Sequence, residues 1–192
     1  VRITSYYGLQ ALVVPSKAKS EADAYWRFSG EVVSSRQAQD ILDGKPREGS
    51  KSHLISRALA KVLGTEPEDV FVFSSGMSAI ATLLLALVNQ NDVIVHSGPL
   101  YAATETLIAR ILSRFGVSFV DFPAGATREE LDAIMARAAT LADEKGGKVA
   151  LVYLESPANP TNALVDVEAV RAARDAAFPG DQQPAIAIDN TF

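Results

Sequence analysis

Four short segments of the chain place polar or aromatic side chains directly beside apolar runs. The first, Ser74–Ser78, precedes an apolar pattern of helical period and contains Gly76. The free N–H groups and the dipole at a helix N-terminus bind phosphate, and glycine allows a ligand to approach the backbone closely. The alternative interpretation is an ordinary strand-to-helix turn with a serine cap.

The second and third segments are Gly98–Tyr101 and Glu155–Pro160, each of which follows an apolar run. The ring of Tyr101 can stack on a planar ligand, and its hydroxyl can exchange protons. Two prolines flank Asn159 and fix its backbone, so that its amide can donate to an anionic oxygen. The alternatives are a packing role for Tyr101 and a rigid turn around Asn159.

The fourth segment is Asp189–Thr191, which follows the apolar residues 185–188. A carboxylate beside an apolar sheet core is unfavourable unless it meets a positive partner, and a protonated pyridine nitrogen is one such partner. The alternative is an aspartate that caps the next helix. Together the four segments supply contacts for a phosphate, a ring face, a phenolic oxygen and a ring nitrogen, which predicts a pyridoxal phosphate (PLP) pocket.

The elements that must position these segments follow a βαβ rhythm. We predict strands at 71–73, 93–96, 117–122, 149–155 and 185–189. The last two are almost entirely apolar, as expected when helices cover both faces of a sheet. The four segments then lie at one edge of a three-layer, mostly parallel α/β domain.

Helix boundaries are marked by their own residues. Thr127 with Glu130 forms a predicted capping box, Asp166 caps a later helix, and Gly116 closes the segment that begins near Tyr101. The pattern weakens before residue 70. There we expect an irregular arm over 8–19, a helix over 34–42, a loop over 44–50 and a helix over 52–63 that stops at Gly64.

Composition narrows the possible functions. The formal charge is −5 and the 18 basic residues are scattered, which argues against nucleic acid as a partner. No apolar run approaches the roughly 20 residues that span a membrane. A nucleotide site is disfavoured because GxGxxG is absent and residues 44–52 do not fit a Walker A motif. His53 and His96 have no second ligand at metal spacing, and no cysteine is present, so no metal site is expected and the cytoplasm is the expected location.

The chain resembles the Cys/Met metabolism (transsulfuration) family in the order of four motifs. They are SSGMSAI at 74–80, LYAAT at 100–104, ESPANP at 155–160 and DNT at 189–191. Members of this family are PLP enzymes of fold type I, with the aspartate aminotransferase-like large domain, and include cystathionine γ-synthase, cystathionine lyases and methionine γ-lyase. The resemblance implies that the N–H groups of Gly76 and Met77 hold the cofactor phosphate with Ser75 alongside. Further implied roles are stacking and proton transfer by Tyr101, a bond from Asn159 to the 3′-oxygen, pairing of Asp189 with the ring nitrogen, and Thr191 in the same cofactor-binding set.

The resemblance also implies a Tyr-x-Arg pair that reaches the phosphate of a neighbouring subunit, so that the intact protein would be a homodimer or homotetramer. Tyr25 and Arg27 have this pattern, and Arg36 competes with Arg27 for the role. Residues 1–51 would then be an arm and cross-subunit segment, and residues 52–192 the first part of the PLP-binding large domain. Ala103 stands where methionine γ-lyases carry a cysteine, which favours a cystathionine γ-synthase-like enzyme.

The family's cofactor-anchoring lysine lies beyond the Asp-Asn-Thr motif, and the chain ends at Phe192. We therefore expect the intact protein to catalyse elimination or replacement at the β or γ carbon of sulfur-containing or O-activated amino acids, and this chain alone to be inactive. The alternative is a catalytically incompetent truncated homologue or split-protein half that binds PLP weakly or serves as an interaction domain.

Overall fold

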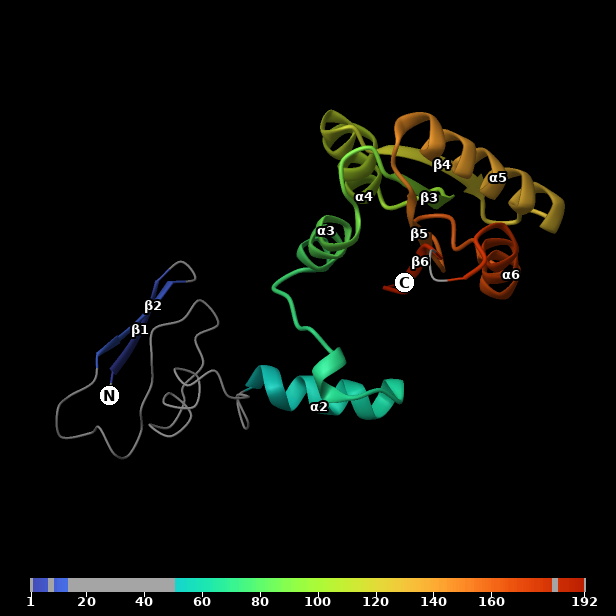
Figure 1. Ribbon diagram of the computed structural model, residues 1–192. Coiled ribbons are helices and arrows are strands. Elements are labelled where there is room, and N and C mark those ends of the chain that lie inside the picture. Colours follow the sequence, from blue (N-terminus) through green and yellow to red (C-terminus); the bar gives the residue numbers. More distant parts are fainter. Residues whose placement is uncertain (1, 7–8, 14–50, 181–182, 192) are drawn as a thin grey trace. The chain divides into compact units, whose positions relative to one another are not determined.

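The computed structural model describes residues 2–6, 9–13, 51–180 and 183–191 (Figure 1). They fall into two units, Val1–Phe73 and Ser74–Phe192, which are described separately. The expected helix over 34–42 and loop over 44–50 lie outside the described residues. The division predicted at residues 51 and 52 stays a prediction.

In the first unit, strands β1 (Arg2–Tyr6) and β2 (Leu9–Val13) pair antiparallel, from Arg2 opposite Val13 to Tyr6 opposite Leu9. The prediction of an irregular arm from residue 8 was therefore wrong over Leu9–Val13. The sequence LQALV alternates only weakly, but each of its residues has a partner on β1. Pairing decides the strand here more than intrinsic propensity does.

The helix predicted over 52–63 is confirmed as α2 (Lys51–Leu63). The short 3₁₀ helix η2 (Pro67–Asp69) follows, and the buried Ser56 ties the two together because its hydroxyl donates to the Val70 carbonyl at 3.0 Å. The strand predicted over 71–73 is wrong. These residues have no ladder partner among the described residues, and Phe71 is 76% exposed, so the apolar triplet is an extended connection.

The second unit contains a four-stranded parallel sheet in the order β4-β3-β5-β6. The strands are β3 (Val93–Gly98), β4 (Ser118–Pro123), β5 (Val149–Glu155) and β6 (Ala185–Asp189). β5 is buried at every residue, which matches its continuous apolar sequence. A register shift between β3 and β5 leaves Ala150 unpaired. From there on, Leu151, Tyr153 and Glu155 alternate onto one face of the strand.

Helices cover both faces of this sheet, as the three-layer prediction requires (Figure 1). One core cluster joins the sheet to α5 (Arg128–Lys145) and α6 (Val167–Ala177). The other joins it to α3 (Gly76–Leu87) and to the helical segment that starts with α4 (Ala102–Thr106). Leu151 and Tyr153 belong to this second cluster, so the Glu155 side of β5 faces α3.

The predicted helix boundaries agree with the structure. Thr127 and Glu130 form the capping box of α5, and the Asp166 carboxylate accepts the Ala169 N–H at the start of α6. The segment that ends at Gly116 is less regular than expected, because α4 continues as the π-helix η3 (Leu107–Ile111) and the 3₁₀ helix η4 (Leu112–Phe115). Gly116 has a φ of 85°, a left-handed conformation that glycine adopts without steric cost.

Candidate functional site

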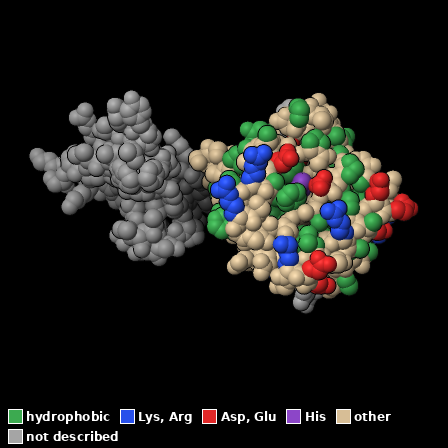
Figure 2. Space-filling view, turned by 90° about the horizontal axis from the view of Figure 1, so that it is seen from above, with side chains coloured by type: hydrophobic (Ala, Val, Ile, Leu, Met, Phe, Trp, Pro, Cys, Tyr) green, Lys and Arg blue, Asp and Glu red, His purple; other side chains and the backbone are tan. Residues whose placement is uncertain are grey.

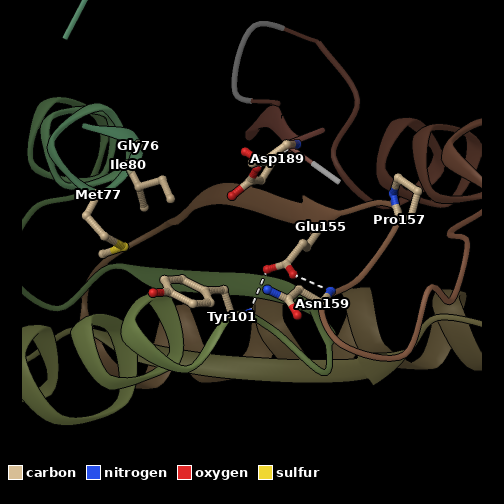
Figure 3. Close-up of a pocket in the computed structure, with 9 residues that line it drawn as sticks. Gly76, Met77, Ile80, Tyr101, Glu155, Pro157, Asn159 and Asp189 are labelled. Carbon is tan, nitrogen blue, oxygen red and sulfur yellow. Dashed lines mark hydrogen bonds between the residues drawn. The ribbon is translucent and has the colours of Figure 1, made fainter. Parts of the chain in front are cut away.

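A pocket of about 290 Å³ lies at the carboxyl ends of β5 and β6, beside the N-terminus of α3 (Figure 3). This size is at the lower end of pockets that hold small molecules. Six of the predicted cofactor residues come together in its lining, from four segments far apart in the sequence. They are Gly76, Met77, Tyr101, Asn159, Asp189 and Thr191.

The α3 N-terminus supplies backbone donors to this pocket. Ser75 is the helix cap: its hydroxyl accepts the Ser78 N–H at 3.1 Å, and its own N–H donates to the Ser78 hydroxyl at 3.0 Å. The capping box therefore occupies the polar groups of Ser75, which does not line the pocket. The N–H groups of Gly76 and Met77 have no partner among the described residues and remain available to an anion.

Glu155, at the end of β5, holds the two loops that carry Tyr101 and Asn159. One of its carboxylate oxygens accepts the Tyr101 N–H at 2.7 Å, and the other accepts the Asn159 N–H at 2.7 Å, as the dashed lines of Figure 3 show. Glu155 is only 4% exposed, whereas Tyr101 is 44% exposed. We call Glu155 and these two hydrogen bonds the Glu155 clamp. The clamp is buried, while the Tyr101 side chain that it helps to place remains open to a ligand.

Asp189, at the end of β6, lies opposite Glu155 in the ladder and points into the pocket (Figure 3). One of its oxygens accepts the hydroxyl of the buried Tyr153 at 3.2 Å, and the other accepts the N–H and hydroxyl of Thr191 at 3.1 and 2.6 Å. Burial and the neighbouring Asp189 carboxylate raise the pKa of Tyr153 above its ordinary value. Tyr153 is thus held in its protonated, donating form.

Several residues of the site were missed by sequence analysis. Ile80, Glu155 and Pro157 line the pocket, and the Tyr153 hydroxyl donates a hydrogen bond to Asp189. The alternation along β5 puts Tyr153 and Glu155 on one face, two residues apart, which was a usable sign that both point toward the site. The expected phosphate ligands Tyr25, Arg27 and Arg36 lie outside the described residues.

The residues present fit a PLP molecule. Two free N–H groups at a helix N-terminus suit its phosphate, an exposed aromatic ring suits its flat face, and the Asp189 carboxylate suits a protonated ring nitrogen. Among the described residues that line the pocket there is no lysine or arginine, whereas there are two carboxylates.

A second, more open pocket of about 420 Å³ lies between the ends of β3 and β4 and includes His96, Phe119 and Asp121. On the face in Figure 2, basic and acidic side chains are interspersed, with no basic stripe. Among the described residues there is no cluster of three or more His, Asp or Glu side chains arranged to hold a metal ion. None of the helices described is both long and apolar enough to cross a membrane.

Known proteins are similar to this chain in sequence and in fold. Over 160 residues, 80% of this chain, the sequence is 30% identical to cystathionine beta-lyase MetC of Staphylococcus haemolyticus, of which it covers 36%. It is also 30% identical to alanine racemase ungC of Aspergillus violaceofuscus over 87% of this chain and 34% of that protein. The chain thus spans about a third of the length of these relatives.

A Campylobacter jejuni protein assigned as an O-acetylhomoserine (thiol)-lyase, solved with pyridoxyl-lysine phosphate, shares the fold. The TM-score is 0.54 at 23% identity, over 72% of this chain and 30% of that one. The family model for the Cys/Met metabolism PLP-dependent enzymes matches residues 47–192, which is more than half of the sequence. The chain therefore belongs to the Cys/Met metabolism PLP-dependent enzyme family.

Proposed function

We propose that the protein to which this chain belongs uses PLP to eliminate or replace a group at the β or γ carbon of a sulfur-containing or O-activated amino acid. The observation that carries the proposal is the convergence of six motif residues from four distant segments on one pocket at the carboxyl edge of the sheet. Family membership supplies the cofactor and the general type of reaction.

In this proposal each part of the pocket contacts a different part of the cofactor. The N–H groups of Gly76 and Met77 hold the phosphate, the Tyr101 ring covers one face, and the Asn159 amide donates to the ring hydroxyl oxygen. Ser75 contributes by starting α3 rather than by direct contact, since its hydroxyl and N–H are engaged with Ser78.

PLP, when bound, supplies an electron sink for the substrate Cα. Asp189 would keep a proton on the ring nitrogen, because a carboxylate close to that nitrogen favours its charged form. Thr191 and Tyr153 fix both oxygens of Asp189, so this charge is held in one orientation. Tyr101 would hold and move a proton at its hydroxyl oxygen. Its side chain is exposed and lines the pocket, so that the hydroxyl can reach a bound substrate.

Within the family, we propose a cystathionine γ-synthase-like replacement reaction, which Ala103 favours over methionine γ-lyase chemistry. A second candidate is racemisation at Cα, which is supported by the likeness to the fungal alanine racemase over most of this chain. Racemisation also begins with removal of the Cα proton, so the pocket described serves either outcome.

Product analysis of the full protein with PLP separates these candidates. An O-acyl homoserine should give a keto acid, ammonia and the released carboxylate, or a thioether and the same carboxylate when a thiol is added. Asp189→Ala should abolish this turnover. Conversion of L-alanine to its D-form without keto acid would replace the proposal with a racemase. Full turnover by Asp189→Ala, or no PLP binding at all, would overturn the assignment of the pocket.

The oligomeric state and cellular location remain predictions. We propose a homodimer or homotetramer, in which Tyr25 with Arg27 or Arg36 of one subunit meets the phosphate of another, and a cytoplasmic location. The lack of a cation in the described pocket lining supports the need for such a residue. Light scattering of the full protein tests the assembly, and a monomer that binds PLP tightly would contradict it.

A further inference from the structure

We propose that Glu155 is a positioning residue that sets the distance between the ring of Tyr101 and the amide of Asn159, and thereby the affinity for PLP. The inference rests on the proposed function. Glu155 is the last residue of β5, and its buried carboxylate binds backbone N–H groups from two different loops.

The two hydrogen bonds have the geometry of charge-assisted contacts. Both are 2.7 Å long, which is short for an N–H donor and typical of an ionised acceptor. One reaches Tyr101, 54 residues away in the sequence, and the other reaches Asn159, four residues away. A single side chain therefore joins the loop after β3 to the loop after β5.

Glu155 is itself fixed to the sheet. Its N–H donates to the hydroxyl of the buried Ser97 on β3 at 3.0 Å, and it pairs with Asp189 across the ladder. The carboxylate thus extends from a rigid strand end. Because that strand pairs with the strand of Asp189, the two loops are held in a fixed position relative to Asp189. Tyr101, Asn159 and Asp189 are then already in place before a ligand binds. A rigid planar ligand binds such an arrangement with little reorganisation of the protein.

Among protein side chains, only a carboxylate can accept the two backbone N–H groups in this way. It offers two acceptor oxygens and no donor, whereas glutamine replaces one oxygen with an NH₂ group. In Glu155→Gln, one of the two backbone N–H groups then faces another donor, and the loop that carries it must move. The side-chain size is kept, so the change breaks one of the two hydrogen bonds without opening a cavity.

Asp92 provides a matched control at the opposite edge of the sheet. It is also 4% exposed, and its two oxygens accept the N–H groups of Asn89 at 2.8 Å and Lys148 at 3.1 Å. None of these three residues lines the pocket. Asp92→Asn breaks the same kind of hydrogen bond, and its effect on PLP measures general destabilisation alone.

The experiment measures PLP affinity and amide signals in the full protein. In Glu155→Gln, the PLP dissociation constant should rise roughly tenfold, as expected for a weakened hydrogen bond to a charged group, and at most about twofold in Asp92→Asn. Without PLP, the Tyr101 and Asn159 amide proton resonances should move in Glu155→Gln and stay in place in Asp92→Asn. Equal loss of affinity in both folded variants, or unmoved amide resonances, would overturn the inference.

Wild-type protein gives a second test that does not depend on the variant folding. The Tyr101 and Asn159 amides should exchange with solvent as slowly as those of β5, and exchange at the rate of an open loop would refute the clamp. If wild-type protein binds no PLP, the proposed function fails, whereas the exchange and resonance data still decide whether the clamp exists.

Discussion

A buried carboxylate accepts two backbone N–H groups at each end of the parallel sheet, but only one of the two ends forms the candidate pocket. At the amino ends of the strands, here called the amino edge, the Asp92 carboxylate accepts N–H groups from two loops. At the carboxyl ends, here called the carboxyl edge, the Glu155 carboxylate does the same. The loops at the amino ends are closely packed, since a Cβ on Gly147 would collide with the Asn91 carbonyl group. The carboxyl edge instead leaves a pocket of about 290 Å³.

The difference shows that a buried carboxylate clamp by itself makes no site. At the amino edge the backbone of Gly147 packs closely against that of Asn91, and neither Asp92 nor its two partners line the pocket. At the carboxyl edge the clamped loops carry Tyr101 and Asn159, whose side chains line the open pocket. Substitutions at the first edge should therefore change stability, and substitutions at the second should change ligand affinity.

The largest expected effect is on affinity at the carboxyl edge. Asp189→Asn keeps an oxygen for Tyr153 but removes the charge that would pair with a protonated ring nitrogen. The PLP dissociation constant should rise roughly tenfold to 100-fold, the effect expected when a charged hydrogen bond is lost. The control Asp121→Ala, at an exposed site on β4 outside this pocket, should leave it unchanged. Unaltered affinity in Asp189→Asn would break the assignment of this edge.

The next effect is on stability at the amino edge. Gly147→Ala forces a methyl group against the Asn91 carbonyl and the Asp92 N–H, so the backbone must shift. Overpacking of this kind costs about 1–3 kcal/mol. Chemical denaturation should show that loss, with PLP affinity per folded molecule preserved. Gly125→Ala, where a Cβ meets nothing within 4 Å, is the control. A Gly147→Ala protein as stable as wild type would show that the amino edge is not packed as described.

A smaller effect is expected at Ser75. Ser75→Ala removes the cap of α3, which should cost about 1 kcal/mol of the free energy of unfolding. PLP affinity should fall by less than about threefold, because the Ser75 hydroxyl is occupied by Ser78 and the N–H groups of Gly76 and Met77 remain. A much larger loss of affinity would show that the Ser75 hydroxyl binds the cofactor directly.

The smallest effect concerns pH. The raised pKa of Tyr153 means that the folded protein keeps this proton when the unfolded chain, with an ordinary pKa of about 10, has lost it. The stabilisation is therefore complete below pH 10 and is lost as the pH rises toward the folded-state value. Tyr153→Phe should show a shallower loss of stability above pH 10 than wild type. Identical profiles would show that Tyr153 is not buried against Asp189.

Sequence reasoning located the pocket residues because each motif ends a strand or starts a helix, and parallel strands bring such ends to one edge. It missed Glu155 and Tyr153 as supports because their roles depend on which backbone groups the fold places beside them. The strand predicted at 71–73 failed since apolar content alone does not supply a pairing partner, and β2 was missed for the converse reason. Caps such as Thr127 and Asp166 were predictable because their partners are three residues away.

The most direct test of the account is a titration of the isotope-labelled full protein with PLP, followed through backbone amide resonances. The N–H signals of Gly76, Met77, Tyr101 and Asn159 should move in step as PLP is added, while those of Asn89 and Lys148 at the amino edge stay in place. Movement confined to the amino edge, or none at the α3 N-terminus, would contradict the claim that the carboxyl edge is the cofactor site.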